Sequence, residues 1–328
     1  MGGDHAPSAV VDGAVAAARH LAVQIALVGR ADALQEALAA HPDWRQLGLE
    51  IVDAPDVVSM RDPPAATLRR KPHASIRVAA DLVAQKRASA LFSAGHTGAT
   101  VMAAYGAFGL IPGVDRPALA TTIPTRARPA VLLDAGANVE CRPQHLLQFG
   151  VMGSVYARVA LGAERPRVGL LSIGEEETKG NELTREAHRM LKAAPLNFIG
   201  NIEGREIYSG KADVIVCDGF TGNVVLKTSE GLVDTVEALL GEELQGTFSS
   251  QVGYLLSRRA FRRFRRRVDY SEYGGVPLLG VAGLTIVGHG RSSAKAVRNA
   301  IAVAFRFASS NFIQRVEQEI AAASVPRP

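Results

Sequence analysis

Short apolar runs rich in Val, Ile and Leu alternate along the chain with longer stretches in which apolar residues recur at helical spacing. The short runs predict strands over 25–29, 49–54, 89–95, 118–124, 130–136, 168–174, 197–204, 213–219 and 284–290. The longer stretches predict helices over 7–20, 31–41, 74–86, 97–108, 143–160, 182–193, 223–244 and 293–323. Strands and helices that alternate without a fixed repeat or a low-complexity linker predict an α/β fold.

Most of these strands are continuously apolar, which is typical of strands covered by helices on both faces. We therefore expect a doubly wound, largely parallel sheet, with ligands bound at the carboxyl ends of its strands. No break in composition divides the chain, so we expect a single α/β domain over residues 1–328. The strand–helix rhythm stops only over 242–275, where we expect a protruding helical excursion.

Composition narrows the class of protein. Apolar residues make up 47% and charged residues 21% of 328 residues, as in ordinary globular proteins. The two cysteines, Cys141 and Cys217, form no disulfide framework or CxxC pair, which indicates a reducing cytoplasm. Residues 88–114 carry no charge, but they include His96, Pro112 and many small residues, so we expect a buried strand and helix there instead of a membrane span. No signal peptide is expected at the start.

The formal charge of +5 is concentrated in the excursion, where seven arginines lie between 258 and 267. Apolar residues at helical spacing predict a strip flanked by these cations, which suits an anionic membrane surface or an acidic partner. The plain alternative is a solvated helix whose Phe residues enter the core. Nucleic acid is not expected, because no recognised binding motif accompanies the arginines. The candidate membrane or carrier contacts are Leu255, Leu256, Arg258, Arg259, Phe261, Arg262 and Phe264.

Two glycine turns precede predicted helices and can present backbone N–H groups to an anion. The first is MGGDHAP (1–7) and the second is SAGHTGA (93–99). The alternative is that both are ordinary strand-to-helix turns, with His96 capping its helix. The candidate phosphate-binding residues are Gly2, Gly3, Asp4, His5, Ser93, Gly95, His96, Thr97 and Gly98.

Further polar groups follow other predicted strands. GEEETKGNEL (174–183) places Lys179 and Asn181 where they can bind an anion or a carbonyl oxygen, or where Asn181 caps the next helix. DAGANVECRP (134–143) supplies Asp134 and Asn138, which can orient a ligand or cap a helix. Asn223 follows the strand over 213–219, and His289 lies in GHGRSSAKA (288–296).

Several familiar signatures are absent from the sequence. No GxGxxG follows the early strands, and GREIYSGKA (204–212) has neither the spacing nor the final residue of a Walker A loop. HExxH and GxSxG do not occur either. The repeated glycine turns with nearby Lys and Arg therefore indicate a small anionic ligand.

Nine motifs in order over almost the whole chain resemble those of the bacterial phosphate acyltransferases. They are MGGDHAP, SAGHTGA, DAGANVECRP, LQFGVMGSVYA, IGEEETKGNEL, NFIGNIEGREI, SGKADVIVCDGFTGNVVLKTSEG, YGGVPLLGV and GHGRSSAKA. The resembled family has a strand ending in Asp-Ala ahead of MGGDHAP, so we expect the translation start to lie upstream of Met1. It commonly has Asn where this chain has His96.

The resemblance implies reversible transfer of a fatty acyl group from acyl carrier protein to inorganic phosphate. The product, acyl phosphate, would supply a membrane glycerol-3-phosphate acyltransferase in phospholipid synthesis. The resemblance also implies a fold similar to phosphotransacetylases and isocitrate dehydrogenase-like enzymes, a homodimer, and a cytoplasmic location with peripheral attachment to the inner face of the membrane. We expect no cofactor and no metal.

For this reaction we expect the two glycine turns and Lys179 to hold phosphate. We expect Asn181 and Asn223 to polarise the thioester carbonyl, and His289 is a weaker candidate for protonating the leaving thiolate. Two alternatives stay open: a docking scaffold that uses the arginine helix and performs no chemistry, and a phosphotransacetylase that acts on short acyl-CoA.

Overall fold

The computed structural model describes residues 1–268 and 274–323, except for the side chains of residue 248 and residues 265–268. Its helices are α1 (Ser8–Ala18), α2 (Ala31–Leu38), α3 (Pro64–Arg70), α4 (Ser75–Ala84), α5 (Thr97–Phe108), α6 (Pro143–Leu161), α7 (Glu182–Ala193), α8 (Gly219–Gly246), α9 (Phe248–Val268), α10 (Ala294–Ser309) and α11 (Phe312–Ala323). Its strands are β1 (Ile25–Gly29), β2 (Leu49–Asp53), β3 (Ala90–Ser93), β4 (Ala118–Leu119), β5 (Thr121–Ile123), β6 (Ala130–Leu133), β7 (Arg167–Leu171), β8 (Asn197–Ile202), β9 (Val214–Val216), β10 (Val276–Leu279) and β11 (Leu284–Val287). Short 3₁₀ turns cover Trp44–Leu47 and Gly204–Glu206.

The strands of the described residues form three sheets, with the orders β1-β2, β3-β11-β10-β4 and β5-β6-β9-β7-β8. The pairs β1–β2, β3–β11, β6–β9, β9–β7 and β7–β8 are parallel. Strand β10 runs antiparallel to β11 and β4, and β5 runs antiparallel to β6. The predicted α/β fold with largely parallel sheets is confirmed, and the antiparallel strands lie where the two larger sheets adjoin.

The observed elements differ from the sequence prediction in several places, and helix α3 is one that was not predicted. The strand predicted over 118–124 divides at Ala120, so that β4 and β5 join different sheets. Strand β10 was not predicted, because Pro277 and the glycines beside it are unfavourable for strands. Helix α8 begins at Gly219, earlier than predicted, because the Asp218 side chain caps it. The predicted final helix divides into α10 and α11 at Asn311, where φ is 53°.

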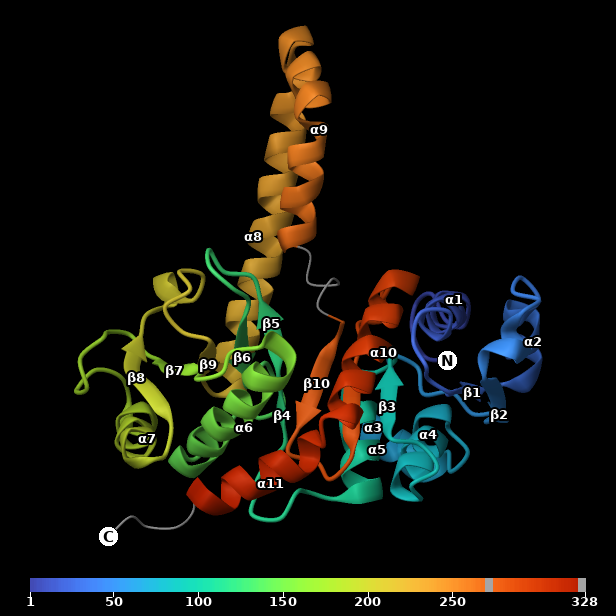
Figure 1. Ribbon diagram of the computed structural model, residues 1–328, viewed down its shortest axis with the longest axis horizontal. Helices are drawn as coiled ribbons and strands as arrows, with labels where there is room; N and C mark the ends of the chain where they lie inside the picture. The colour runs from blue at the N-terminus through green and yellow to red at the C-terminus, as the bar shows by residue number, and fades with distance from the viewer. Residues whose placement is uncertain (269–273, 324–328) are drawn as a thin grey trace.

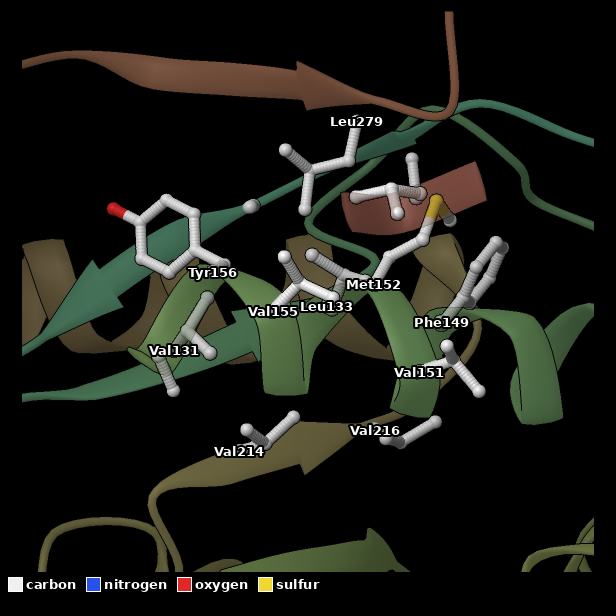
Figure 2. Packing of buried hydrophobic residues seen from close by; sticks show 14 of the residues in the cluster. Val131, Leu133, Phe149, Val151, Met152, Val155, Tyr156, Val214, Val216 and Leu279 are labelled. Atoms are coloured by element: carbon white, nitrogen blue, oxygen red, sulfur yellow. The ribbon is translucent and has the colours of Figure 1, made fainter. Parts of the chain in front are cut away.

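Helix α6 forms the centre of the main core. Its side chains from Phe149 to Tyr156 face strands β6 and β9 on one side and Leu279 of β10 on another (Figure 2). Gly153 allows the close approach, since a Cβ there would lie 2.5 Å from Val214 Cγ1. The longest apolar helix of the body thus joins the five-stranded sheet to the four-stranded sheet.

The excursion predicted over 242–275 is a pair of long helices. Helix α8 leaves the body, turns at Thr247, and α9 returns beside it, so that the pair projects as an arm (Figure 1). It carries exposed apolar side chains on both helices, among which Leu255 and Leu256 are the most exposed. Residues 269–273 of the predicted excursion lie outside the described residues.

Strand β1 pairs with β2 but not with β3. A cavity of about 1100 Å³ separates β1 from β3, and residues of α1, α4 and α10 complete its wall. The sheet is therefore interrupted between its first two strands and the rest.

Candidate functional site

The first two glycine turns meet at the carboxyl end of β3. The Asp4 N–H donates a hydrogen bond of 2.8 Å to the Gly290 carbonyl, which follows β11. A Cβ on Gly2 would lie 2.4 Å from the Val58 carbonyl oxygen, and one on Gly3 would lie 2.6 Å from the Ala94 carbonyl oxygen. Because any side chain would clash with these carbonyls, the turn 1–5 requires glycine at both positions. The structure thus places the predicted phosphate turns side by side, together with the turn that contains His289.

The turn after β3 is organised by its own side chains. The Gly95 N–H donates to Ser93 Oγ at 3.2 Å, and the Thr100 hydroxyl donates to the same oxygen at 3.1 Å. His96 Nδ1 accepts from the Ala99 N–H at 3.4 Å and so caps α5, as the structural alternative expects. Thr97 is exposed at the first turn of this helix. The positive end of the α5 dipole therefore faces the meeting point of the turns.

A second group of polar residues lies at the carboxyl ends of β6 and β9. Asp134, which directly follows β6, is fully buried. Its two carboxylate oxygens accept hydrogen bonds from the N–H groups of Leu119, Gly136, Ala137 and Asn138 and from the Asn138 side-chain amide, at 2.7–3.1 Å. Burial raises the pKa of Asp134, and the hydrogen bonds from Leu119, Ala137 and Asn138 oppose that shift.

Asp134 fixes the loop against which Asn223 lies. The Asn138 carbonyl accepts from the Gly219 N–H at 2.8 Å, which joins this loop to the first residue of α8. A Cβ on Gly136, where φ is 131°, would lie 3.5 Å from Asn223 Cβ. Asn223 itself is exposed, so its amide is accessible at the N-terminal end of α8. Asp218 caps the same helix by accepting from the Thr221 N–H at 2.8 Å.

Lys179 and Asn181 lie in the loop after β7, the strand next to β9. Two of the three neighbouring carboxylates are already paired: Glu175 with Lys211 at 2.7 Å, and Glu177 with Lys192. No hydrogen bond or ion pair joins the side chain of Lys179 to any residue that the structure describes. The Lys179 ammonium is exposed and remains accessible to an anionic ligand.

Asn181 has a structural role in addition to any chemical one. Its Oδ1 accepts from the Thr184 N–H at 2.9 Å, so it caps α7. The buried Asn201 anchors the loop before it, because its side-chain amide donates a hydrogen bond of 2.9 Å to the Glu176 carbonyl. The side-chain N–H groups of Asn181 are the part left for a ligand.

The predicted site residues therefore fall into two groups. One contains the turns after β3 and β11 with residues 2–5; the other contains Lys179, Asn181 and Asn223. Within the described ranges, no hydrogen bond or ion pair joins the two groups. Both follow carboxyl ends of strands, and the arrowheads of β3 and β8 point toward the side from which the arm rises (Figure 1). His289 is exposed and is bonded through its carbonyl, which accepts from the Ser292 N–H at 2.9 Å.

Asp134 was predicted to orient a ligand or cap a helix, and Asp218 was given no role; in the structure Asp134 holds the loop after β6 and Asp218 caps α8. The available signal was an Asp at or just beyond the end of an apolar run, with a glycine within the next two residues, in DAGAN and in CDGF. The number of backbone donors on Asp134 depends on the fold of the loop, which the sequence pattern does not specify.

The predicted contacts on the arm are accessible. Leu255, Leu256, Arg258, Arg259, Arg262 and Phe264 are exposed, whereas Phe261 is half-buried against Tyr254, with ring centroids 5.3 Å apart. Arg263 is exposed too, and the side chains of residues 265–267, the last three arginines of the cluster, lie outside the described residues. The expectation that the Phe residues enter a core does not hold for Phe264.

The described residues form neither a metal-binding cluster nor a membrane-spanning helix. Residues 1–268 and 274–323 contain no cluster of three or more His, Cys, Asp or Glu side chains placed to hold a metal ion. No helix in the same ranges is both long and apolar enough to cross a membrane.

Comparisons with known proteins give consistent results. Residues 1–315 match a family described as "Fatty acid synthesis protein". The phosphate acyltransferase of Acidobacterium capsulatum is 52% identical over 321 residues, which cover 98% of this chain and 95% of that protein. The phosphate acyltransferase of Heliobacterium modesticaldum is 52% identical over 320 residues, with 98% and 96% covered.

Two solved structures share the fold. A phosphotransacetylase from Streptococcus pyogenes superposes with a TM-score of 0.59 at 17% identity, covering 91% of each chain. The EutD phosphotransacetylase from Staphylococcus aureus gives 0.56 at 15% identity, covering 91% of this chain and 89% of that one. The predicted similarity to the phosphotransacetylase fold is confirmed.

Proposed function

The chain belongs to the fatty acid synthesis protein family and is an acyltransferase with phosphate as acceptor, and on that premise we propose that its donor is acyl-acyl carrier protein and that the reaction is reversible. The family's description, fatty acid synthesis, supports a fatty acyl donor. The accessible Lys179 ammonium at the sheet edge, beside two carboxylates that are paired with other cations, supports phosphate binding. A cation so placed suits a phosphate that must stay anionic to react.

In the proposed step, a phosphate oxygen attacks the thioester carbonyl carbon. The new C–O bond forms as the C–S bond breaks, and the electron pair leaves with the carrier thiolate, which then takes a proton. Phosphate is an anionic nucleophile near neutral pH, so the reaction needs no strong base. The protein holds the two reactants in position, which can lower the activation free energy by up to about 7 to 11 kcal/mol. It also provides hydrogen-bond donors to the developing oxyanion.

We assign phosphate binding to Lys179 and the two glycine turns, namely Gly2 to His5 and Ser93 to Gly98. Asn181 and Asn223 would polarise the carbonyl, with Asn181 acting through its side-chain N–H groups because its oxygen caps α7. His289, exposed after β11, is the candidate proton donor to the thiolate.

Attack by phosphate itself is favoured over a covalent enzyme intermediate. Burial raises the pKa of Cys217 well above its ordinary value and that of Cys141 to about 11. Both thiols would be protonated near pH 7, and a thiol is a much weaker nucleophile than a thiolate.

We assign the arm to the membrane surface. Exposed Leu255 and Leu256 next to exposed Arg258 and Arg259 suit an anionic lipid bilayer, where apolar side chains enter and cations stay at the headgroups. The protein would then be a cytoplasmic homodimer with a single α/β domain per chain, attached peripherally to the membrane. There it would deliver acyl phosphate to a membrane glycerol-3-phosphate acyltransferase.

The test is acyl-phosphate formation by the purified protein from palmitoyl-acyl carrier protein and inorganic phosphate, with hydroxylamine trapping. We expect palmitoyl hydroxamate with this donor and at least tenfold less with acetyl-CoA. Supplying palmitoyl phosphate and free carrier protein should return the thioester. A preference for acetyl-CoA would indicate a phosphotransacetylase. Folded protein that forms no acyl phosphate from any donor would favour the docking scaffold.

A further inference from the structure

Four large apolar side chains are exposed next to the loops that carry Asn223 and Lys179. The exposed fractions are 66% for Val139, 82% for Ile173, 61% for Phe220 and 49% for Val224. Single exposed apolar residues are common on protein surfaces, but a group of them at one site usually marks a binding surface.

The topology brings these four residues together. Strands β6, β9 and β7 are adjacent and parallel, with Leu133 opposite Val216 and Val216 opposite Leu170. Val139, Phe220 and Ile173 each lie just beyond one of these strands. The hydrogen bond from the Gly219 N–H to the Asn138 carbonyl joins the residues that directly precede Phe220 and Val139.

Helix α8 then orients two of the side chains with Asn223. Phe220, Asn223 and Val224 are related as i, i+3 and i+4, so they share one face of the helix. Leu232, another exposed residue of α8, lies 12 positions beyond Phe220 and therefore about 120° around the helix. The exposed apolar residues of α8 from Leu232 on lie more than two turns beyond Val224, so they are outside the group at Asn223.

We propose that Val139, Ile173, Phe220 and Val224 form the surface on which the acyl chain of the donor lies. This inference rests on the proposed function, in which Asn223 contacts the thioester carbonyl. The chain begins at that carbonyl, so its first methylenes must lie within a few ångströms of Asn223. A hydrocarbon chain gains about fourfold in affinity for each methylene that is fully removed from water.

The experiment compares long and short donors in matched variants. Phe220→Asn and Ile173→Asn remove apolar surface from the group, and Leu232→Asn makes a comparable change at a residue that is 62% exposed on another face of α8. For each protein, kcat/KM is measured with palmitoyl-acyl carrier protein and butyryl-acyl carrier protein. The affinity for cis-parinaric acid, a fluorescent 18-carbon fatty acid, is measured separately, and thermal unfolding checks that each variant is folded.

We expect the palmitoyl-to-butyryl ratio of kcat/KM to fall about tenfold in Phe220→Asn and Ile173→Asn, and less than twofold in Leu232→Asn. Affinity for the fluorescent fatty acid should fall in the same two variants. Equal losses with both donors would overturn the proposal and assign the surface to the carrier protein. An unchanged ratio in folded variants would also overturn it. If the unaltered protein uses neither donor, the proposed function fails, and the fatty-acid affinities alone decide the acyl surface.

Discussion

At the scale of single residues, Lys179 is a candidate for phosphate binding because of how the carboxylates near it are paired. Glu175 and Glu177 pair with Lys211 and Lys192, so two of the three carboxylates beside Lys179 are already bound to other cations. Among the described residues, no ion pair of Lys179 would have to break before it binds phosphate. This arrangement favours binding of an anion over a structural ion pair.

We expect Lys179→Ala to raise the KM for phosphate about tenfold or more, because a charge-assisted hydrogen bond contributes about 1.5 to 3 kcal/mol. The KM for acyl-acyl carrier protein should change less than twofold. Initial rates at varied phosphate provide the measurement. Lys227→Ala, which removes an exposed cation paired with Glu230 on α8, serves as the control. Normal phosphate kinetics in Lys179→Ala would mean that Lys179 does not bind phosphate.

Asn181 combines a cap and a candidate donor in one side chain, and substitution can separate the two roles. Asp retains the oxygen that accepts from the Thr184 N–H but has no N–H group when ionised. We expect Asn181→Asp to keep the melting temperature and to lower kcat at least tenfold. Asn181→Ala should lower kcat similarly and also cost about 1 kcal/mol of stability through the lost cap. Full activity in Asn181→Asp would mean that Asn181 caps α7 and has no role in the reaction.

The residue types of the site could be identified from sequence, but their grouping could not. The glycine turn at the start of the chain indicated Gly2 and Gly3, where another stretch of backbone comes close. The five donors on Asp134 come from β4 and from the loop after β6, which are joined only in the folded chain. The pairing of Lys211 with Glu175 likewise links positions 36 residues apart.

At the scale of elements, strands buried between helices were predictable, because hydrophobic burial on both faces produces long apolar runs. Strands β6, β7 and β9 are examples. Strand β10 contains a proline and is bounded by glycines, so its pairing depends on β4 and β11 beside it. The arm was predictable as helix from its composition, whereas its return alongside α8 depends on the turn at Thr247.

The exposed leucines of the arm lead to a prediction about membrane binding. Leu255→Asp with Leu256→Asp places two charges where apolar side chains are 67% and 81% exposed, so binding to anionic lipid vesicles should fall at least tenfold. Gln251→Asp with Ser257→Asp adds the same charge at exposed polar positions of α9 and should have a smaller effect. Sedimentation with phosphatidylglycerol-containing vesicles measures both. Equal losses in the two double variants would indicate charge repulsion alone.

At the scale of the whole molecule, the interrupted sheet divides the core. Val11, Leu27 and Leu38 belong to a cluster around β1, β2, α1 and α2, separate from the cluster that surrounds α6. The cavity of about 1100 Å³ leaves one side of β1 without a neighbouring strand. Strand β1 pairs with β2 and packs in its own small core, so the β1–β2 unit is expected to be the least stable part of the body.

Native-state hydrogen exchange tests this division. The amides of Ile25 and Leu27 in β1, which point toward β2, should exchange at least tenfold faster than those of Leu132 in β6 and Ile215 in β9, because the β1–β2 unit can open while the five-stranded sheet stays folded. The difference should disappear in denaturant near the global unfolding midpoint, where all these amides exchange through the same unfolded state. Equal protection in water would mean that the α1–α10 contact, at which Gly13 packs against Val297, couples the two parts into one cooperative unit.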